Sequence, residues 1–160
     1  MQRRAALGDE RAYTDLIRLT QGATYRLIAR YVFDRVEAND LLQETYAAGW
    51  LAIKRYDTDR PFGPWLRRIA LNKCRDWSRR RMVRRAIAGV LGLETSEAQS
   101  AAEPGLDAEG QLIERETSDR LAREIAKLPA KLKEPLLLTA IEGLSQAEVA
   151  ALLGISTKAV

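Results

Sequence analysis

The stretch Leu144–Val160, LSQAEVAALLGISTKAV, decides how the whole chain is interpreted. Ser145 can cap a helix, and Glu148 lies three residues later, where a capping box places its acidic partner. Gly154 suits the left-handed residue that ends such a helix, and Ser156 can then cap a second one. This pattern is typical of a helix-turn-helix, whose second helix enters the major groove of DNA.

The apolar residues of this motif fit the same interpretation. Val149, Leu152 and Leu153 supply a buried face, and Ile155 is the expected apolar plug between the two helices. An ordinary helical hairpin is the alternative. The sequence stops four residues into the second helix, so we expect most side chains that read base edges to be absent.

Further helices precede the motif. Residues 113–127 and 134–142 have helical spacing, with a break at Leu128 and Pro129 and a C-terminal cap at Gly143. Before them, residues 86–112 are rich in Ala, Gly, Ser and Glu and have poor periodicity. We expect a flexible acidic linker there.

The first half of the chain also has helical periodicity. We expect helices over residues 9–20, 23–33 and 34–55, a loop over 55–63, and a fourth helix from Phe62 or Pro64. Long polar–apolar alternation is absent from the sequence, so no strand is expected. The predicted fold class is all-α, with two small helical domains joined by the linker.

The third helix has the clearest signals. Asp34 can cap it, and Glu37 follows at the capping-box position. Its apolar stripe has spacings of four, four and three residues, which place it on one helical face. The stripe consists of Leu42, Tyr46, Trp50 and Ile53.

Charge is distributed unevenly along the chain. The 160 residues have a net charge of +4, but residues 1–85 have a balance of +9 and residues 86–160 one of −5. The run Arg67–Arg85 holds nine basic residues and one acid, Asp76. Such a run indicates a polyanion partner, most commonly nucleic acid, although a solvated helix face is the alternative.

Several classes of function are excluded by composition. The chain has no histidine, which removes Ser-His-Asp and Cys-His catalysis and zinc sites with histidine ligands. Its single cysteine, Cys74, cannot form an internal disulfide, and a small buried role is expected for it. We expect no metal, cofactor, signal peptide or membrane insertion, and a cytoplasmic protein.

Three ordered motifs resemble the extracytoplasmic-function (ECF) sigma factors, small bacterial transcription initiation subunits. Ala38–Tyr46, ANDLLQETY, resembles the family's helix that binds the polymerase clamp. Phe62–Arg81 resembles its promoter-melting helix, and the helix-turn-helix follows at the end. The resemblance implies sigma domain two over residues 1–85, a linker over 86–112 and sigma domain four over 113–160.

The resemblance also implies function and partners. It implies a non-enzymatic initiation factor that binds the clamp and flap of core RNA polymerase, recognises and melts promoter DNA, and is held by an anti-sigma factor. Asp40 and Glu44 are four residues apart and share a helical face, where they can meet basic residues of the polymerase. The complete set expected to bind polymerase is Asp40, Leu41, Gln43 and Glu44.

DNA contacts are expected at two places. Arginines of the basic helix can neutralise phosphates, while Tyr56 belongs to the segment that resembles the family's base-capturing loop. We expect Trp50 and Trp65 to pack in the core. The set expected at the melted element is Tyr56, Arg68, Asn72, Arg75, Asp76, Arg79 and Arg80. The candidates for the upstream element are Ser156, Thr157 and Lys158.

Three other functions compete with this interpretation. A stand-alone helix-turn-helix repressor would bind duplex DNA without polymerase. A sigma-like decoy would capture an anti-sigma protein and would not need the basic run. A nucleic-acid enzyme would need a metal site, for which Asp57 and Asp59 are the candidates, without a third acid close to them.

Overall fold

A computed structural model describes residues 1–90, 120–121 and 124–160. Within these residues the fold is all-α, which confirms the predicted class, and none of them lies in a strand. The N-terminal domain consists of α1 (Gln2–Ala6), α2 (Glu10–Val32), α3 (Arg35–Ala52), the 3₁₀ turn η1 (Ile53–Arg55) and α4 (Phe62–Val90). The C-terminal domain contains α6 (Ala130–Leu136), the π-helical η2 (Leu137–Ile141), α7 (Gln146–Leu153) and the 3₁₀ turn η3 (Thr157–Ala159). Of the predicted linker, residues 86–90 belong to α4, and residues 91–112 lie outside the described residues.

The two helices predicted over residues 9–20 and 23–33 are a single helix, α2. Asp9 caps it by accepting a hydrogen bond of 3.0 Å from the Ala12 amide. Gly22 lies on its exposed side, while Leu16 and Leu27 are buried on either side of it in the chain. The burial of these flanks outweighs the cost of a mid-helix glycine, about 1 kcal/mol.

α3 begins where the sequence predicts. The Asp34 carboxylate accepts hydrogen bonds from the amides of Val36 and Glu37, at 2.9 and 3.1 Å. The α-helix ends at Ala52, and the chain continues to Arg55 as the 3₁₀ turn η1. α4 begins at Phe62 as expected, but it extends to Val90, beyond the domain boundary predicted at residue 85.

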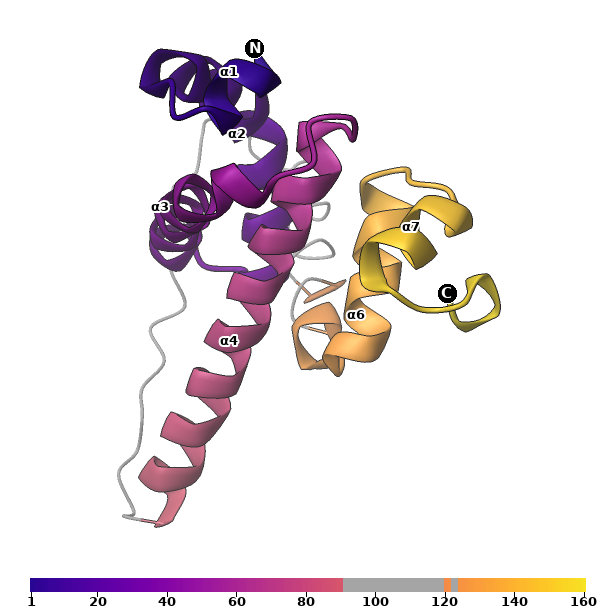
Figure 1. The fold of residues 1–160 in the computed structure, drawn as a ribbon. Coiled ribbons are helices and arrows are strands. Elements are labelled where there is room, and N and C mark those ends of the chain that lie inside the picture. Colours follow the sequence, from indigo (N-terminus) through magenta and orange to yellow (C-terminus); the bar gives the residue numbers. More distant parts are fainter. Residues whose placement is uncertain (91–119, 122–123) are drawn as a thin grey trace, which may run out of the picture.

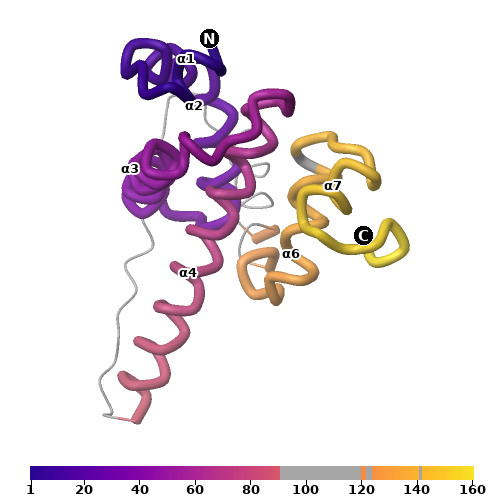
Figure 2. The backbone as a smooth tube through the Cα atoms, viewed as in Figure 1, coloured from indigo at the N-terminus to yellow at the C-terminus, as the bar shows by residue number. Residues whose placement is uncertain are grey.

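Two apolar clusters hold the helices together. One joins α1, the first half of α2, the end of α3 and the start of α4, and it is rich in aromatic rings. The other continues from the N-terminal domain into the C-terminal domain, where Leu137, Leu138 and Val149 have exposed fractions of 1%, 0% and 0%. Figures 1 and 2 show α6 and α7 lying beside α4. The two domains therefore share one core in this structure.

The C-terminal domain corrects part of the sequence prediction. The helix expected over residues 134–142 begins earlier, at Ala130, and contains Pro135. The wider π-helical turn η2 begins at Leu137, two residues after this proline. Such turns occur where the regular hydrogen-bond ladder is interrupted, and proline interrupts it because it lacks an amide hydrogen.

The motif at the end of the chain forms largely as expected. Ser145 and Glu148 form a complete capping box at the start of α7. Gly143 and Gly154 have φ angles of 66° and 70°, the left-handed region that favours glycine. Val149 and Leu152 are buried, but Ile155 is 39% exposed and does not act as a plug.

The second helix of the motif is shorter than its pattern implies. Its described residues form only the 3₁₀ turn η3, and the Ser156 side chain makes no capping hydrogen bond there. The predicted cap at Ser156 is therefore wrong for this structure.

Candidate nucleic-acid and polymerase interfaces

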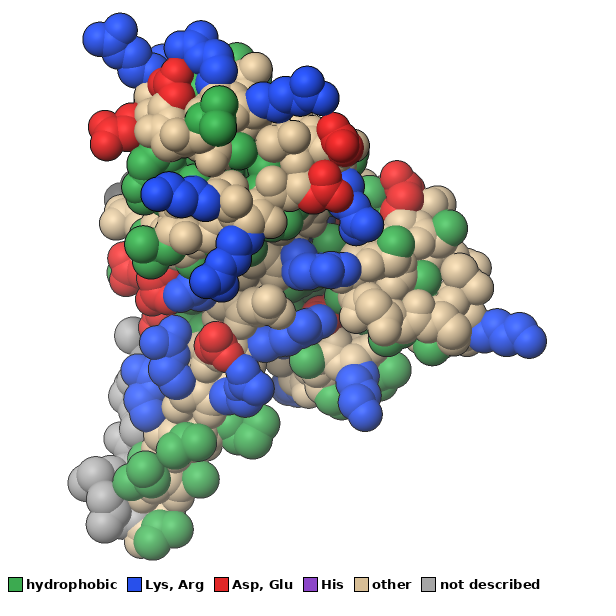
Figure 3. Space-filling view, viewed as in Figure 1, with side chains coloured by type: hydrophobic (Ala, Val, Ile, Leu, Met, Phe, Trp, Pro, Cys, Tyr) green, Lys and Arg blue, Asp and Glu red, His purple; other side chains and the backbone are tan. Residues whose placement is uncertain are grey.

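The basic run of the sequence lies on α4 and divides between two faces. Arg68, Asn72, Arg75 and Arg79 are spaced by four, three and four residues, so they form one row along the helix. Figure 3 shows Lys and Arg side chains gathered along the middle of α4. The row has the charge and the length to follow a nucleic-acid backbone. We call these three arginines, together with Asn72, the arginine row.

Two members of the arginine row contact the C-terminal domain. The Arg75 guanidinium donates to both carboxylate oxygens of Glu134, at 2.7 and 2.5 Å. The Arg68 guanidinium donates to the carbonyl oxygens of Leu152 and Ala151, at 3.2 and 2.9 Å. The other two members stay within α4: Asn72 accepts from Arg75 at 3.1 Å, and Arg79 pairs with Asp76.

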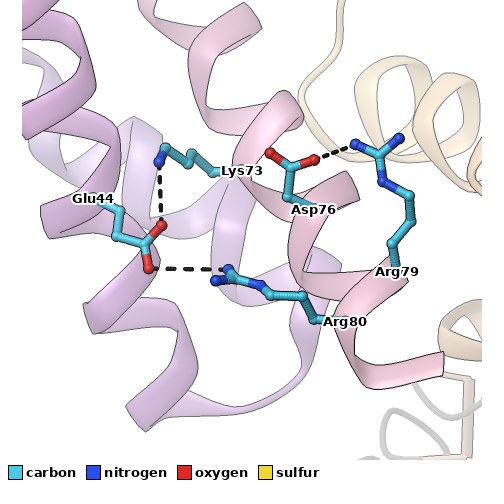
Figure 4. Close-up of a pocket in the computed structure, with 5 residues that line it drawn as sticks. All are labelled: Glu44, Lys73, Asp76, Arg79 and Arg80. Atoms are coloured by element: carbon cyan, nitrogen blue, oxygen red, sulfur yellow. Dashed lines mark hydrogen bonds and ion pairs between the residues drawn. The ribbon is translucent and has the colours of Figure 1, made fainter. Parts of the chain in front are cut away.

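The second face of α4 turns toward α3. Figure 4 shows a shallow pocket between these helices, lined by Glu44 from α3 and by four residues of α4, which are Lys73, Asp76, Arg79 and Arg80. Glu44 is 3.3 Å from the Lys73 ammonium and 4.0 Å from the Arg80 guanidinium. Its carboxylate therefore links the two helices and lies between two cations of its own chain.

The expected polymerase-binding residues separate into three kinds. Asp40 and Gln43 are exposed on α3 and can meet a partner. Leu41 is only 1% exposed and lies in the core cluster shared by the domains, so its expected contact with polymerase is corrected to a packing role. Glu44 is half-buried and paired with α4.

Tyr56, expected from the sequence to contact DNA, is buried in the structure. Its ring is 5% exposed and lies 4.8 Å from Trp65 and 5.7 Å from Phe62, measured between ring centroids. Its hydroxyl donates to Gln2 Oε1 at 2.8 Å and also contacts the Arg60 carbonyl. Burial raises the pKa of Tyr56, and the Asp57 charge adds to this rise. Tyr56 is therefore a core residue that closes the loop before α4.

The three tryptophans all pack inside the N-terminal domain. Trp50 and Trp65 lie against the aromatic cluster, as the sequence predicts. Trp77 is 6% exposed and belongs to the shared core. The Arg81 guanidinium lies 5.1 Å from its ring centroid, a distance typical of a cation–π contact.

Asp57 and Asp59, the candidates for the metal site of a nucleic-acid enzyme, are hydrogen-bonded or ion-paired to nearby residues. Asp57 accepts from the Asp59 amide at 3.1 Å and pairs with Arg60 at 3.2 Å, while Asp59 pairs with Arg3. Among the described residues there is no group of three His, Cys, Asp or Glu that could hold a metal ion. The described helices also include none with the length and apolar character to cross a membrane.

The upstream-element candidates Ser156, Thr157 and Lys158 are all exposed at the end of the chain. Sequence reasoning missed two other functional candidates, Lys133 and Glu134, which are 5% and 3% exposed. Their charge gave no signal of burial, because charged residues are almost never fully buried unless they are paired. Only their partners in α2 and α4 identify them as contact residues between the domains.

Comparisons with known proteins match both domains. The sequence model of Sigma-70 region 2 matches residues 16–84, and that of Sigma-70, region 4 matches residues 118–160. The RNA polymerase sigma factor CnrH of Cupriavidus metallidurans is 40% identical in an alignment of 159 residues that covers 98% of this chain and 82% of that protein. The ECF RNA polymerase sigma factor SigW of Bacillus subtilis is 31% identical, over 92% of this chain and 80% of its own length.

Solved structures agree with these relatives. CnrH in complex with the cytosolic domain of CnrY has a TM-score of 0.67 at 30% identity, over 99% of this chain and 83% of that one. RpoE in complex with the anti-sigma factor NepR from Bartonella quintana has a TM-score of 0.67 over 92% of this chain and 86% of that one. Its identity is 19%, so this second likeness supports the fold alone.

The fold and the arginine row define a two-domain helical protein with a surface suited to nucleic acid. The matches make the family specific: the chain belongs to the sigma-70 family of RNA polymerase sigma factors, in its extracytoplasmic-function group. It is a transcription initiation factor that acts with core RNA polymerase at promoter DNA. The family consists of transcription factors and not, in general, of enzymes.

Proposed function

We propose that α3 and α4 divide the work of this initiation factor between polymerase and DNA. The supporting observation is the geometry of the two helices: α3 exposes Asp40 and Gln43, and α4 carries the arginine row. The proposed N-terminal domain covers residues 1–85, the linker 86–112 and the C-terminal domain 113–160. The last turn of α4 continues past this first boundary.

In this proposal Asp40 and Gln43 bind the polymerase clamp directly. Asp40 presents a carboxylate to a basic surface, and Gln43 is exposed three residues along the same helix. Glu44 acts through α4: by pairing with Lys73 and Arg80 it fixes the angle between α3 and α4. It is therefore a positioning residue for the clamp surface.

The arginine row and its neighbours are proposed to hold the melted strand. Arg68, Arg75, Arg79 and Arg80 neutralise phosphates, which supplies affinity without sequence information. Asn72 offers a donor and an acceptor to a base, and Asp76 orients Arg79 through their ion pair. Ser156, Thr157 and Lys158 contact phosphates of the upstream element, and the rest of the C-terminal domain meets the flap.

Regulation by an anti-sigma protein is proposed from the relatives. CnrH and RpoE were each solved in complex with a protein partner, CnrY and the anti-sigma factor NepR respectively. We infer that an anti-sigma factor holds this chain in the same way, that the chain has no catalytic activity of its own, and that it works in the cytoplasm.

Binding to bacterial core RNA polymerase tests the clamp assignment. Asp40→Arg should weaken binding about tenfold or more, equivalent to ~1.4 kcal/mol, because it reverses an exposed charge opposite a basic surface. Asp15→Arg is the matched control, since Asp15 is a partly exposed acid on α2 that pairs only locally with Arg18 in the described residues. Equal affinity of Asp40→Arg and wild type would contradict the clamp assignment.

Promoter opening tests the assignment of the arginine row. On a duplex promoter, Arg79→Ala should reduce open-complex formation while binding to core polymerase stays unchanged. Arg18→Ala on α2 is the matched control, because it removes one exposed arginine of the same domain outside the arginine row. An equal loss in both variants would show that net charge, and not the arginine row, governs opening.

A further inference from the structure

Phe33 has a backbone conformation that a phenylalanine rarely adopts. It ends α2 with φ and ψ angles of 55° and 31°, in the left-handed region, and its amide donates to the Ala29 carbonyl at 2.9 Å. Among the described residues it is the one non-glycine residue with a positive φ, since Gly8, Gly143 and Gly154 hold the other such positions. A bulky side chain makes this conformation costly, whereas glycine adopts it freely. The end of α2 would therefore be less strained without the phenylalanine ring.

The Phe33 ring has no place in the described core. Phe33 is 37% exposed and belongs to neither apolar cluster. An apolar residue directly before a helix cap often packs against the fourth residue of that helix, which is Ala38 in α3. Ala38 is 0% exposed and lies in the shared core, but that core does not include Phe33. Core packing in the described residues therefore gives no reason for an aromatic side chain at this position.

Exposure by itself does not distinguish Phe33 from other apolar residues. Leu19 of α2 is 72% exposed and Leu51 of α3 is 85% exposed, and single exposed apolar side chains are common on soluble proteins. These leucines lie inside regular helices, where the backbone is unstrained. Phe33 combines an exposed aromatic ring with an unfavourable backbone, and residues of this kind often occur where a protein binds its partners.

Phe33 precedes the surface of α3 that is proposed to bind the polymerase clamp. Val36, Asp40 and Gln43 are spaced by four and three residues, so they lie along one face of α3. Val36 is 67% exposed in the first turn, and Asp40 follows about 6 Å further along the helix axis. Phe33 is three residues before Val36, so their Cα atoms are at most ~11 Å apart. The two apolar residues therefore lie at one end of a surface that continues with an acid and an amide.

We propose that Phe33 and Val36 are apolar anchors of the polymerase contact, against which an apolar side chain of the clamp packs. A protein partner is favoured over DNA, because neither residue carries a charge for phosphates and the next exposed charge on this face is the acid Asp40. Protein interfaces are enriched in aromatic residues, and a buried aromatic anchor commonly supplies a large part of the affinity. The left-handed backbone of Phe33 is then retained for binding. This inference rests on the proposed binding of the clamp by Asp40 and Gln43.

Variants of the full chain separate the ring from the backbone, and surface plasmon resonance measures their binding to bacterial core RNA polymerase. Phe33→Gly and Phe33→Asn remove the ring and relieve the strain, while Phe33→Tyr keeps both. Val36→Thr keeps the shape of valine and adds a hydroxyl to the surface. Leu19→Ala is the matched control, because Leu19 is an exposed apolar residue ~21 Å along α2 from Phe33. Urea denaturation, followed by circular dichroism, measures the stability of each variant.

We expect Phe33→Gly and Phe33→Asn to weaken polymerase binding about tenfold or more, and Val36→Thr to weaken it by a smaller factor. Phe33→Tyr and Leu19→Ala should keep an affinity within about twofold of the wild type. The urea midpoint of Phe33→Gly should equal or exceed that of the wild type, because glycine adopts the left-handed backbone without strain. A variant that is at least as stable and binds less tightly would place the ring in the interface.

Unchanged polymerase affinity in Phe33→Gly would overturn the inference, and a lower urea midpoint in that variant would then show that the ring packs within the chain. An equal loss of affinity in Leu19→Ala would also overturn it, because the effect would not be specific to this surface. Asp40→Arg tests the proposed function separately. If Asp40→Arg weakens binding and Phe33→Gly does not, the clamp assignment stands and the apolar anchor fails. If only Phe33→Gly weakens binding, the anchor stands and the assignment of Asp40 fails.

Discussion

At the scale of single residues, Gly49 is fixed by a close approach between α3 and α2. A Cβ atom at this position would lie 2.6 Å from the Tyr13 hydroxyl, which donates to the Tyr46 carbonyl at 2.7 Å. We expect Gly49→Ala to lower the free energy of unfolding by about 1–3 kcal/mol, because the buried hydroxyl must leave its acceptor. Urea denaturation measures this change.

The contrast with Gly22 makes this prediction specific. A Cβ at Gly22 would meet only Arg26 Nη1, at an ordinary 3.5 Å, so Gly22→Ala should raise the free energy of unfolding by about 0.5–1 kcal/mol.

A double variant tests the cause of the cost at Gly49. When Tyr13→Phe is combined with Gly49→Ala, the hydroxyl that the new Cβ would meet is removed. An equal cost of Gly49→Ala with and without the Tyr13 hydroxyl would disprove this explanation.

Cys74 is a buried thiol and not a redox site. It is 0% exposed, and burial, with a contribution from the Glu134 charge, raises its pKa to about 12. The reactive thiolate is therefore scarce and shielded at neutral pH. We expect no reaction of the folded chain with a thiol reagent at pH 8, and complete reaction in denaturant. Rapid labelling of the native protein would show that the shared core opens readily.

At the scale of elements, the capping box of α7 is a local determinant of stability. Ser145→Ala should lower the free energy of unfolding by about 1 kcal/mol, because the Glu148 amide loses its acceptor. Ser156→Ala is the matched control, since the Ser156 side chain makes no such hydrogen bond in the described structure. Thermal or urea unfolding followed by circular dichroism separates the two variants.

The same box predicts a dependence on pH. Hydrogen bonds from Ser145 lower the pKa of Glu148 below its ordinary value of 4.5. A lowered pKa means that this contribution is fully present above pH 4.5 and is lost as pH falls through the lower folded-state pKa. Glu148→Gln should therefore flatten the acid side of the stability profile. If the stability of Glu148→Gln depends on pH as that of the wild type does, the acid sensitivity comes from other residues.

The elements also show what sequence can and cannot predict. The caps at Asp34 and Ser145 and the left-handed Gly143 and Gly154 were predictable, because each depends on neighbouring residues alone. The break expected near Gly22 was wrong, because packing against other helices outweighs a local preference.

The candidate site also divides into features that depend on neighbouring residues and features that depend on tertiary packing. The exposure of Asp40 and Gln43 agrees with their expected role, whereas the burial of Leu41 and Tyr56 depends on helices distant in sequence. The role of Glu134 was out of reach, since its partner Arg75 is 59 residues away. The local sequence pattern therefore identified the basic surface of α4, and only tertiary packing showed which of its residues contact the C-terminal domain.

At the scale of the whole molecule, one apolar cluster joins the domains, and this predicts coupled unfolding. All three tryptophans lie in the N-terminal domain: Trp50 and Trp65 lie against its aromatic cluster and Trp77 lies in the shared core, so their fluorescence reports on that domain and on its contact with the other. Circular dichroism reports on helices of both domains. Because Leu137, Leu138 and Val149 pack in the shared cluster, the two signals should change at one urea concentration in the wild-type chain.

A cavity in the shared core should destabilise both domains together. Leu138 is 0% exposed, and Leu138→Ala should cost about 2–5 kcal/mol. If the cluster stabilises both domains, the variant lowers the midpoint of the fluorescence transition, although position 138 lies in the domain without tryptophan. Leu132→Ala is the matched control, because Leu132 is 59% exposed in α6. A fluorescence midpoint unmoved by Leu138→Ala would mean that the domains fold independently.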